Sequence, residues 1–238
     1  MNDFLRSRFK YTPCGSSIHN LNDIKKALYA EKTKGTAYSG AQAYMVRLSK
    51  KSHHQPAYDW LAREVFNYIN SGKKETQISF DNWHHSICNG FITECAKVGV
   101  SIHYGMAQKF VNLLMKYVYC FDDSTSVDPS KFKYCHLPLD GFTYYSPYKS
   151  YRKTIPYHSY TILTPFYHRQ VNSMPLSKRT VWSKLSYLEY INIQNEIRSY
   201  LTATPMTYND VRHLDPSHLA TVAPSYKLTP FETEFFIW

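Results

Sequence analysis

Apolar residues recur at helical spacing along several stretches of the chain, and these stretches predict its main elements. One face of the helix expected after Pro56 carries the apolar residues Trp60, Leu61, Val65, Tyr68 and Ile69. The next expected helix repeats an apolar residue every four positions, at Trp83, Ile87, Phe91 and Cys95. Because an α-helix has 3.6 residues per turn, each set lies on one side of its helix and predicts a face that packs against a core.

Capping residues and glycines set the expected boundaries of these helices. Asp81 is expected to cap the second helix and Lys97-Val98-Gly99 to end it, because helix ends favour a cation and a glycine. Further helices are predicted over residues 24–32, 36–48, 105–119 and 177–202, whereas residues 147–176 read as a less regular segment. We therefore expect a mostly α-helical chain that forms one domain over residues 1–238, with two lobes around a cleft as a variant.

The charge of the chain favours a polyanionic partner. Lysine and arginine number 28 against 18 aspartates and glutamates, which gives a formal net charge of +10 at pH 7. Nucleic acid is the first candidate for such a partner and an anionic membrane the second. The sequence holds no run of 18 or more apolar residues, so a membrane-spanning helix is not expected. We expect DNA, and no membrane, as the partner.

Cysteines and histidines raise the question of a metal site. The five cysteines stand at positions 14, 88, 95, 120 and 135, without a Cys-x-x-Cys pair or the paired short spacings of a structural zinc site. An odd number of scattered cysteines suits reduced thiols.

The first residues, Met1-Asn2-Asp3-Phe4-Leu5-Arg6, lack a signal-peptide core. We expect a cytoplasmic, monomeric protein with no metal and no other cofactor.

Two short motifs carry the candidate chemistry. Gly105-Met106-Ala107-Gln108-Lys109 is a small-residue turn that delivers a lysine just inside a helix. Pro138-Leu139-Asp140 can open another helix with Asp140 as its N-cap, 31 positions after the lysine. A lysine amine, when neutral, is a nucleophile that forms Schiff bases. The alternative interpretation of Lys109 is a lysine on the surface of an amphipathic helix.

The order of these motifs resembles the helix–hairpin–helix DNA glycosylase superfamily, and more narrowly its bifunctional 8-oxoguanine branch, archaeal-type members included. The resemblance covers roughly residues 80–146, with the helix–hairpin–helix-like element at about 84–119. It implies that Lys109 attacks the sugar C1′ of a flipped-out nucleotide and that Asp140 activates the nucleophile and stabilises the cationic sugar. The implied function is excision of a damaged or modified base, with AP-lyase activity.

Further residues are predicted to hold the DNA and the base. A hairpin of this kind aims backbone N–H groups at a phosphate, and basic side chains nearby add contacts. The predicted DNA-binding residues are Gly105, Ala107, Gln108, Lys116 and Lys97, and the predicted base-pocket residues are Trp83, His136 and Tyr144. Two alternatives stay open: a non-catalytic DNA-binding module that uses the same hairpin, and a helical protein-interaction domain.

Overall fold

The computed structural model describes residues 19–29, 55–121, 127–139, 182–211, 223 and 225–233. Helices dominate these residues, whose extended pairing is limited to an isolated antiparallel bridge between Thr207 and Lys227. The mostly α-helical class predicted from the sequence is therefore confirmed for this part of the chain. The helix expected over 36–48 and the less regular segment expected over 147–176 lie outside the described residues.

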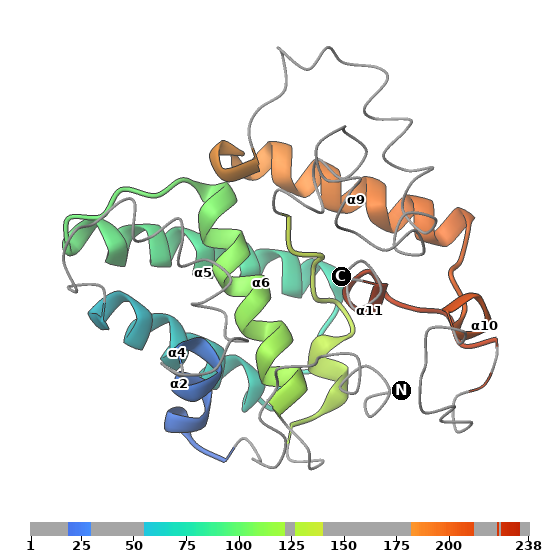
Figure 1. The fold of residues 1–238 in the computed structure, drawn as a ribbon, viewed down its shortest axis with the longest axis horizontal. Coiled ribbons are helices and arrows are strands. Elements are labelled where there is room, and N and C mark those ends of the chain that lie inside the picture. Colours follow the sequence, from blue (N-terminus) through green and yellow to red (C-terminus); the bar gives the residue numbers. More distant parts are fainter. Residues whose placement is uncertain are drawn as a thin grey trace, which may run out of the picture.

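Four helices pack against one another and form what we call the helical body (Figure 1). Their bounds are Leu21–Tyr29 for α2, Gln55–Ile69 for α4, Gln77–Lys97 for α5 and Tyr104–Phe121 for α6. In Figure 1, α6 crosses α5 steeply, and α2 lies beside α4. The predicted apolar faces meet inside this body, where the largest fully buried side chains include Leu61, Phe80, Phe91 and Phe110.

Helix α9 (Tyr187–Ala203) lies outside the helical body and contacts α6 and α11 (Figure 1). The shorter elements around it are η1 (Pro129–Phe132), η4 (Trp182–Lys184), α10 (Tyr208–Val211) and α11 (Pro230–Thr233). Residues 135–139 are buried and carry no helix. This segment runs between the helical body and α9, so its backbone groups need partners from side chains.

Local capping explains where the helices begin, and it corrects two predictions. Thr76 and Ser79 form a capping box that starts α5, so the prediction that Asp81 caps this helix is wrong. Residues 177–181 of the helix expected over 177–202 lie outside the described residues. The described part is interrupted, because Ser186 and Glu189 form a second capping box that starts α9. The end of α5 is confirmed: Val98 is its C-cap, and Gly99 follows with a φ of 76°, which glycine adopts without strain.

Candidate functional site

The Gly105 turn packs inside the protein rather than presenting its amides to solvent. The Gly105 N–H donates to Leu185 O at 3.0 Å, and the Ala107 N–H donates to His103 O at 3.1 Å. A side chain at Gly105 would overlap the carbonyl oxygen of Trp182, so the glycine lets the backbone of η4 approach α6. The phosphate contact predicted for Gly105 and Ala107 would therefore need a different conformation of the turn.

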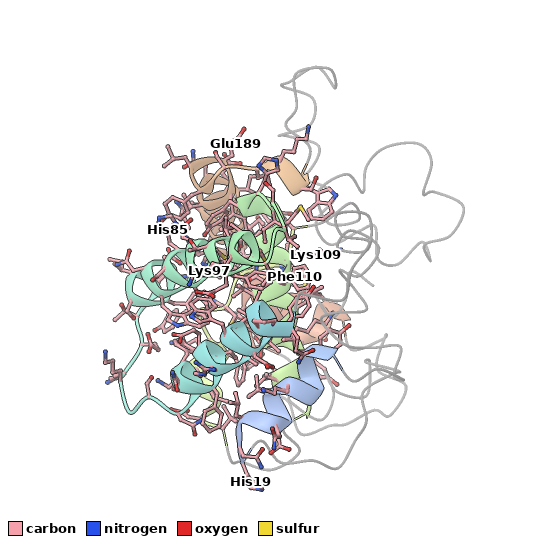
Figure 2. The ribbon with its side chains drawn as sticks, turned by 90° about the vertical axis from the view of Figure 1, so that its left-hand side faces the viewer. His19, His85, Lys97, Lys109, Phe110 and Glu189 are labelled. Carbon is pink, nitrogen blue, oxygen red and sulfur yellow. The ribbon has the colours of Figure 1, made fainter. Side chains whose placement is uncertain are left out.

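Lys109 lies on α6 in a half-buried position, next to the fully buried Phe110 (Figure 2). Its Nζ atom stands 5.1 Å from the centre of the Trp182 ring. The face of an aromatic ring attracts an ammonium group, so Trp182 holds the lysine head near η4. Lys109 is thus neither buried in the core nor extended freely into water.

The two other predicted DNA-binding lysines lie in contrasting places. Lys97 is exposed at the end of α5, where its Nζ pairs with Glu94 Oε1 at 2.6 Å. Lys116 is only 3% exposed, so in this arrangement it lies away from any surface that a phosphate could reach. The placement of Lys97 suits a surface contact, whereas the burial of Lys116 contradicts the contact predicted for it.

Of the residues predicted for the base pocket, the structure describes Trp83 and His136. Trp83 is half-buried and stacks on Tyr68, with the ring centres 4.0 Å apart. His136 is 2% exposed, and its ring meets Phe80 edge-on at 5.0 Å. Tyr144 lies outside the described residues, as does the predicted catalytic Asp140. His136 is buried beside Phe80 and presents no open face for a base. Trp83 packs on Tyr68 and Phe80 but keeps part of its surface exposed.

The side chain of the residue before Lys109 contacts the backbone of the residue before Asp140. Gln108 donates from Nε2 to Leu139 O at 2.6 Å, and the Leu139 N–H donates to Gln108 Oε1 at 3.2 Å. Gln108 is fully buried, which contradicts its predicted contact with DNA. The residue directly before Lys109 thus holds the residue directly before Asp140.

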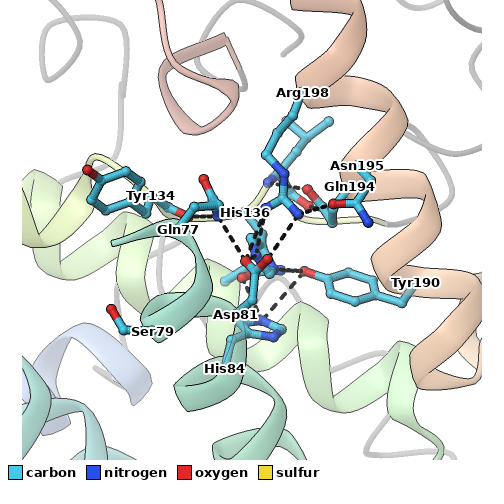
Figure 3. A network of polar contacts seen from close by, with 12 residues as sticks. Gln77, Ser79, Asp81, His84, Tyr134, His136, Tyr190, Gln194, Asn195 and Arg198 are labelled. Atoms are coloured by element: carbon cyan, nitrogen blue, oxygen red, sulfur yellow. Dashed lines mark hydrogen bonds and ion pairs between the residues drawn. The ribbon is translucent and has the colours of Figure 1, made fainter. Parts of the chain in front are cut away.

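A cluster of buried or half-buried polar side chains joins α5, α6, the 135–139 segment and α9 (Figure 3). We call it the polar cluster, and its members are Asp81, His84, Asn112, His136, Tyr190 and Arg198. His136 lies at its centre, with Nε2 2.7 Å from Asp81 Oδ1 and Nδ1 2.8 Å from the Tyr190 hydroxyl. The Arg198 guanidinium donates to both carboxylate oxygens of Asp81, from Nη1 to Oδ1 at 3.0 Å and from Nη2 to Oδ2 at 3.1 Å. Bidentate arginine–carboxylate pairs of this kind are among the stronger hydrogen-bonded contacts in proteins.

Burial sets the charge states within the polar cluster. Burial lowers the pKa of His84 well below its usual value, and the neighbouring His136 acts in the same direction. Burial also lowers the pKa of His136, against the opposing hydrogen bond and charge of Asp81. Burial would raise the pKa of Asp81, but hydrogen bonds from His136, Gln77 and Arg198 outweigh it and bring the value to about 2. A neutral His136 that donates from Nε2 to an ionised Asp81 and accepts at Nδ1 from Tyr190 fits these directions.

The carboxylate–imidazole–phenol chain of this cluster is a potential proton path, but its terminal phenol is fully buried. A group enclosed in this way has no route to a substrate in the described arrangement. The immediate effect of the cluster is therefore to hold the 135–139 segment between α5 and α9.

Sequence reasoning singled out His136 but missed most of its partners. Asp81, His84 and Cys88 follow one face of α5 at spacings of three and four residues, and Tyr190, Gln194 and Arg198 follow one face of α9 at spacings of four. Polar residues at helical spacing beside apolar ones are a signal that could have found this face. The folded structure, rather than the sequence pattern, shows that this face of α5 lies against this face of α9.

Neither a metal centre nor a membrane span emerges from the described residues. Within them, no group of three or more histidine, cysteine, aspartate or glutamate side chains is placed to hold a metal ion. Likewise, none of the helices described is both long and apolar enough to cross a membrane. No protein-family model, curated protein or solved structure matches the chain.

Proposed function

We propose that this protein is a DNA glycosylase with AP-lyase activity, of the helix–hairpin–helix type that its sequence resembles. In the proposed reaction the amine of Lys109 attacks C1′ of a flipped-out nucleotide, and the bond from C1′ to the base breaks. The departing base takes up a proton, and the sugar ring opens to leave an imine between C1′ and Lys109. Asp140 assists by accepting the proton of the amine and by its negative charge near the cationic sugar.

The observation that carries this proposal is the pair of hydrogen bonds between Gln108 and Leu139. A lysine and an aspartate 31 positions apart act on one sugar carbon only if the segments that carry them lie close enough for both side chains to reach it. The two bonds join the residues that directly precede them, which supports the shared site that the motifs predict. The half-buried Lys109, its ammonium over Trp182, also lies at a boundary between core and solvent where a substrate can approach.

Borohydride trapping tests the proposal directly, because borohydride reduces the imine to a stable amine that links protein to DNA. The duplexes to be tested carry 8-oxoguanine, uracil, a modified cytosine or an abasic site. We expect the native chain to form an adduct on at least one of them and the Lys109→Gln variant to form none. Lys133→Gln is the matched control, because Lys133 is an exposed lysine whose Nζ lies 5.3 Å from the ring of Tyr134. It is expected to keep the adduct.

The other outcomes separate the alternative functions. Loss of the base without an adduct, abolished in Asp140→Asn, would indicate a glycosylase that uses water in place of Lys109. DNA binding that weakens steeply with salt, with neither base loss nor adduct, would favour the non-catalytic DNA-binding module. Negligible DNA affinity at low salt would contradict both DNA functions and favour a protein-interaction role.

A further inference from the structure

Two glutamines from different helices hold the backbone that leads to Asp140. Gln194 on α9 donates from Nε2 to Leu137 O at 2.7 Å, and the Leu137 N–H donates to Gln194 Oε1 at 3.2 Å. Gln108 on α6 makes the same two bonds to Leu139. Each side-chain amide thus forms the paired hydrogen bonds that a neighbouring strand would form. We call this arrangement the glutamine clasp, formed by Gln108 with Leu139 and Gln194 with Leu137.

The glutamine clasp uses the backbone hydrogen-bonding groups on either side of a proline. Pro138 stands between the two leucines and has no N–H to donate. Both glutamines and both leucines are at most 1% exposed, so water cannot replace a lost bond. A buried amide without a hydrogen-bond partner costs free energy. Other positions of the Leu137–Leu139 backbone relative to the two glutamines are therefore unfavourable.

The Gln108 amide is itself oriented by its neighbours. Its Nε2 also donates to Gly105 O at 2.8 Å, and its Oε1 also accepts from Asn112 Nδ2 at 3.0 Å. Asn112 in turn donates to the Tyr190 hydroxyl at 2.9 Å, which links the clasp to the polar cluster. The position of Leu139 therefore depends, through Gln108, on the Gly105 turn, on α6 and on α9.

We infer that Gln108 and Gln194 are positioning residues, which set the backbone of Leu137 and Leu139 relative to Lys109; this inference rests on the glycosylase function proposed above. Gln108 precedes Lys109 on α6, and it binds the residue that precedes Asp140. A misplacement of about 1 Å between reacting groups can cost about a hundredfold in rate. Loss of the clasp is therefore expected to slow base excision without weakening DNA binding.

The test replaces each glutamine by methionine, which keeps the length of the side chain and removes its amide. Gln194→Met is expected to speed hydrogen exchange of the Leu137 amide about tenfold or more, and Gln108→Met that of the Leu139 amide. Both variants are expected to lower the single-turnover rate of base excision about a hundredfold. Their dissociation constants for the same duplex are expected to change less than about twofold, since neither glutamine reaches the surface.

Ile197→Ala is the matched control for general destabilisation. Ile197 is fully buried on α9, three residues after Gln194, and it takes no part in the clasp. The control is expected to destabilise the protein and to speed exchange of buried amides generally, without a selective effect at Leu137 and Leu139, and to keep the excision rate. An equal loss of rate in Ile197→Ala would overturn the positioning role and assign the effect to stability.

The remaining outcomes distinguish this inference from the function on which it rests. Native protein that excises no base overturns the proposed function and the positioning role with it, while amide exchange still decides whether the clasp exists. An active native protein whose glutamine variants lose amide protection but keep their excision rate overturns the positioning role alone. Unchanged amide protection in both variants overturns the clasp itself.

Discussion

The helical body and the polar cluster hold the protein together by different interactions. Inside the body, Tyr58, Phe91 and Phe110 pack ring against ring, with centres 5.4 to 6.0 Å apart. Between the body and α9, His136 and Tyr190 are instead joined by directional hydrogen bonds to side chains of three helices. Apolar packing tolerates changes that keep volume, whereas a buried polar group depends on the position of a particular partner atom. The body therefore supplies bulk stability, and the cluster determines where α9 and the 135–139 segment lie.

The largest expected effect is loss of a ring from the helical body. Phe91→Ala removes a fully buried side chain and leaves a cavity between α4, α5 and α6. The expected loss in the free energy of unfolding is about 3–5 kcal/mol. Denaturant unfolding followed by circular dichroism measures it. A loss below about 1 kcal/mol would contradict the assignment of this face as the main core.

The second effect compares two small changes, one in each region. Tyr190→Phe keeps the ring but removes the hydroxyl that partners His136 Nδ1 and Asn112 Nδ2, so about 2–3 kcal/mol of stability is expected to be lost. Leu61→Met in the helical body keeps volume and polarity and is expected to cost less than about 1.5 kcal/mol. Equal costs for the two variants, measured by the same unfolding assay, would remove the distinction between the regions.

The third effect is the acid sensitivity of the polar cluster. The pKa of Asp81 is lowered to about 2, so its contribution to stability is complete above the unfolded value near 4 and is lost as the pH falls to 2. This contribution corresponds to about 2 kcal/mol. Burial lowers the pKa values of His84 and His136, so stability also falls as the pH drops below about 6.5, where the unfolded chain takes up protons first.

Unfolding of native protein and of Asp81→Asn, measured between pH 7 and pH 2, separates these contributions. Between pH 4 and pH 2 the native protein is expected to lose stability more steeply than the variant, because the Asp81 carboxylate is present only in the native protein. The fall below pH 6.5 is expected in both proteins, since His84 stays buried in each. Parallel curves below pH 4 would show that Arg198 and His136 do not stabilise the ionised form of Asp81.

Parts of the structure follow from short stretches of sequence. The apolar faces of α4 and α5 and the end of α5 at Gly99 agree with the pattern, because periodicity and helix termination act over a few residues. The capping boxes at Thr76 and Ser186 are equally local, so the start of α5 and the break before α9 were readable from the sequence. Asp81 was misassigned as a cap because a polar residue ahead of an apolar face suits either role.

The roles of the polar residues were decided by the tertiary structure. The sequence by itself determined that Gly105, Gln108 and Lys109 share a turn and the helix it opens, but their partners come from distant segments. Gln108 binds Leu139, which lies 31 positions away, and Arg198 binds Asp81, which lies 117 positions away. A hydrogen bond needs two atoms at about 3 Å in a suitable direction, and only the packed helices provide that geometry. Apolar faces are set by local periodicity, whereas polar partners are chosen by the completed fold.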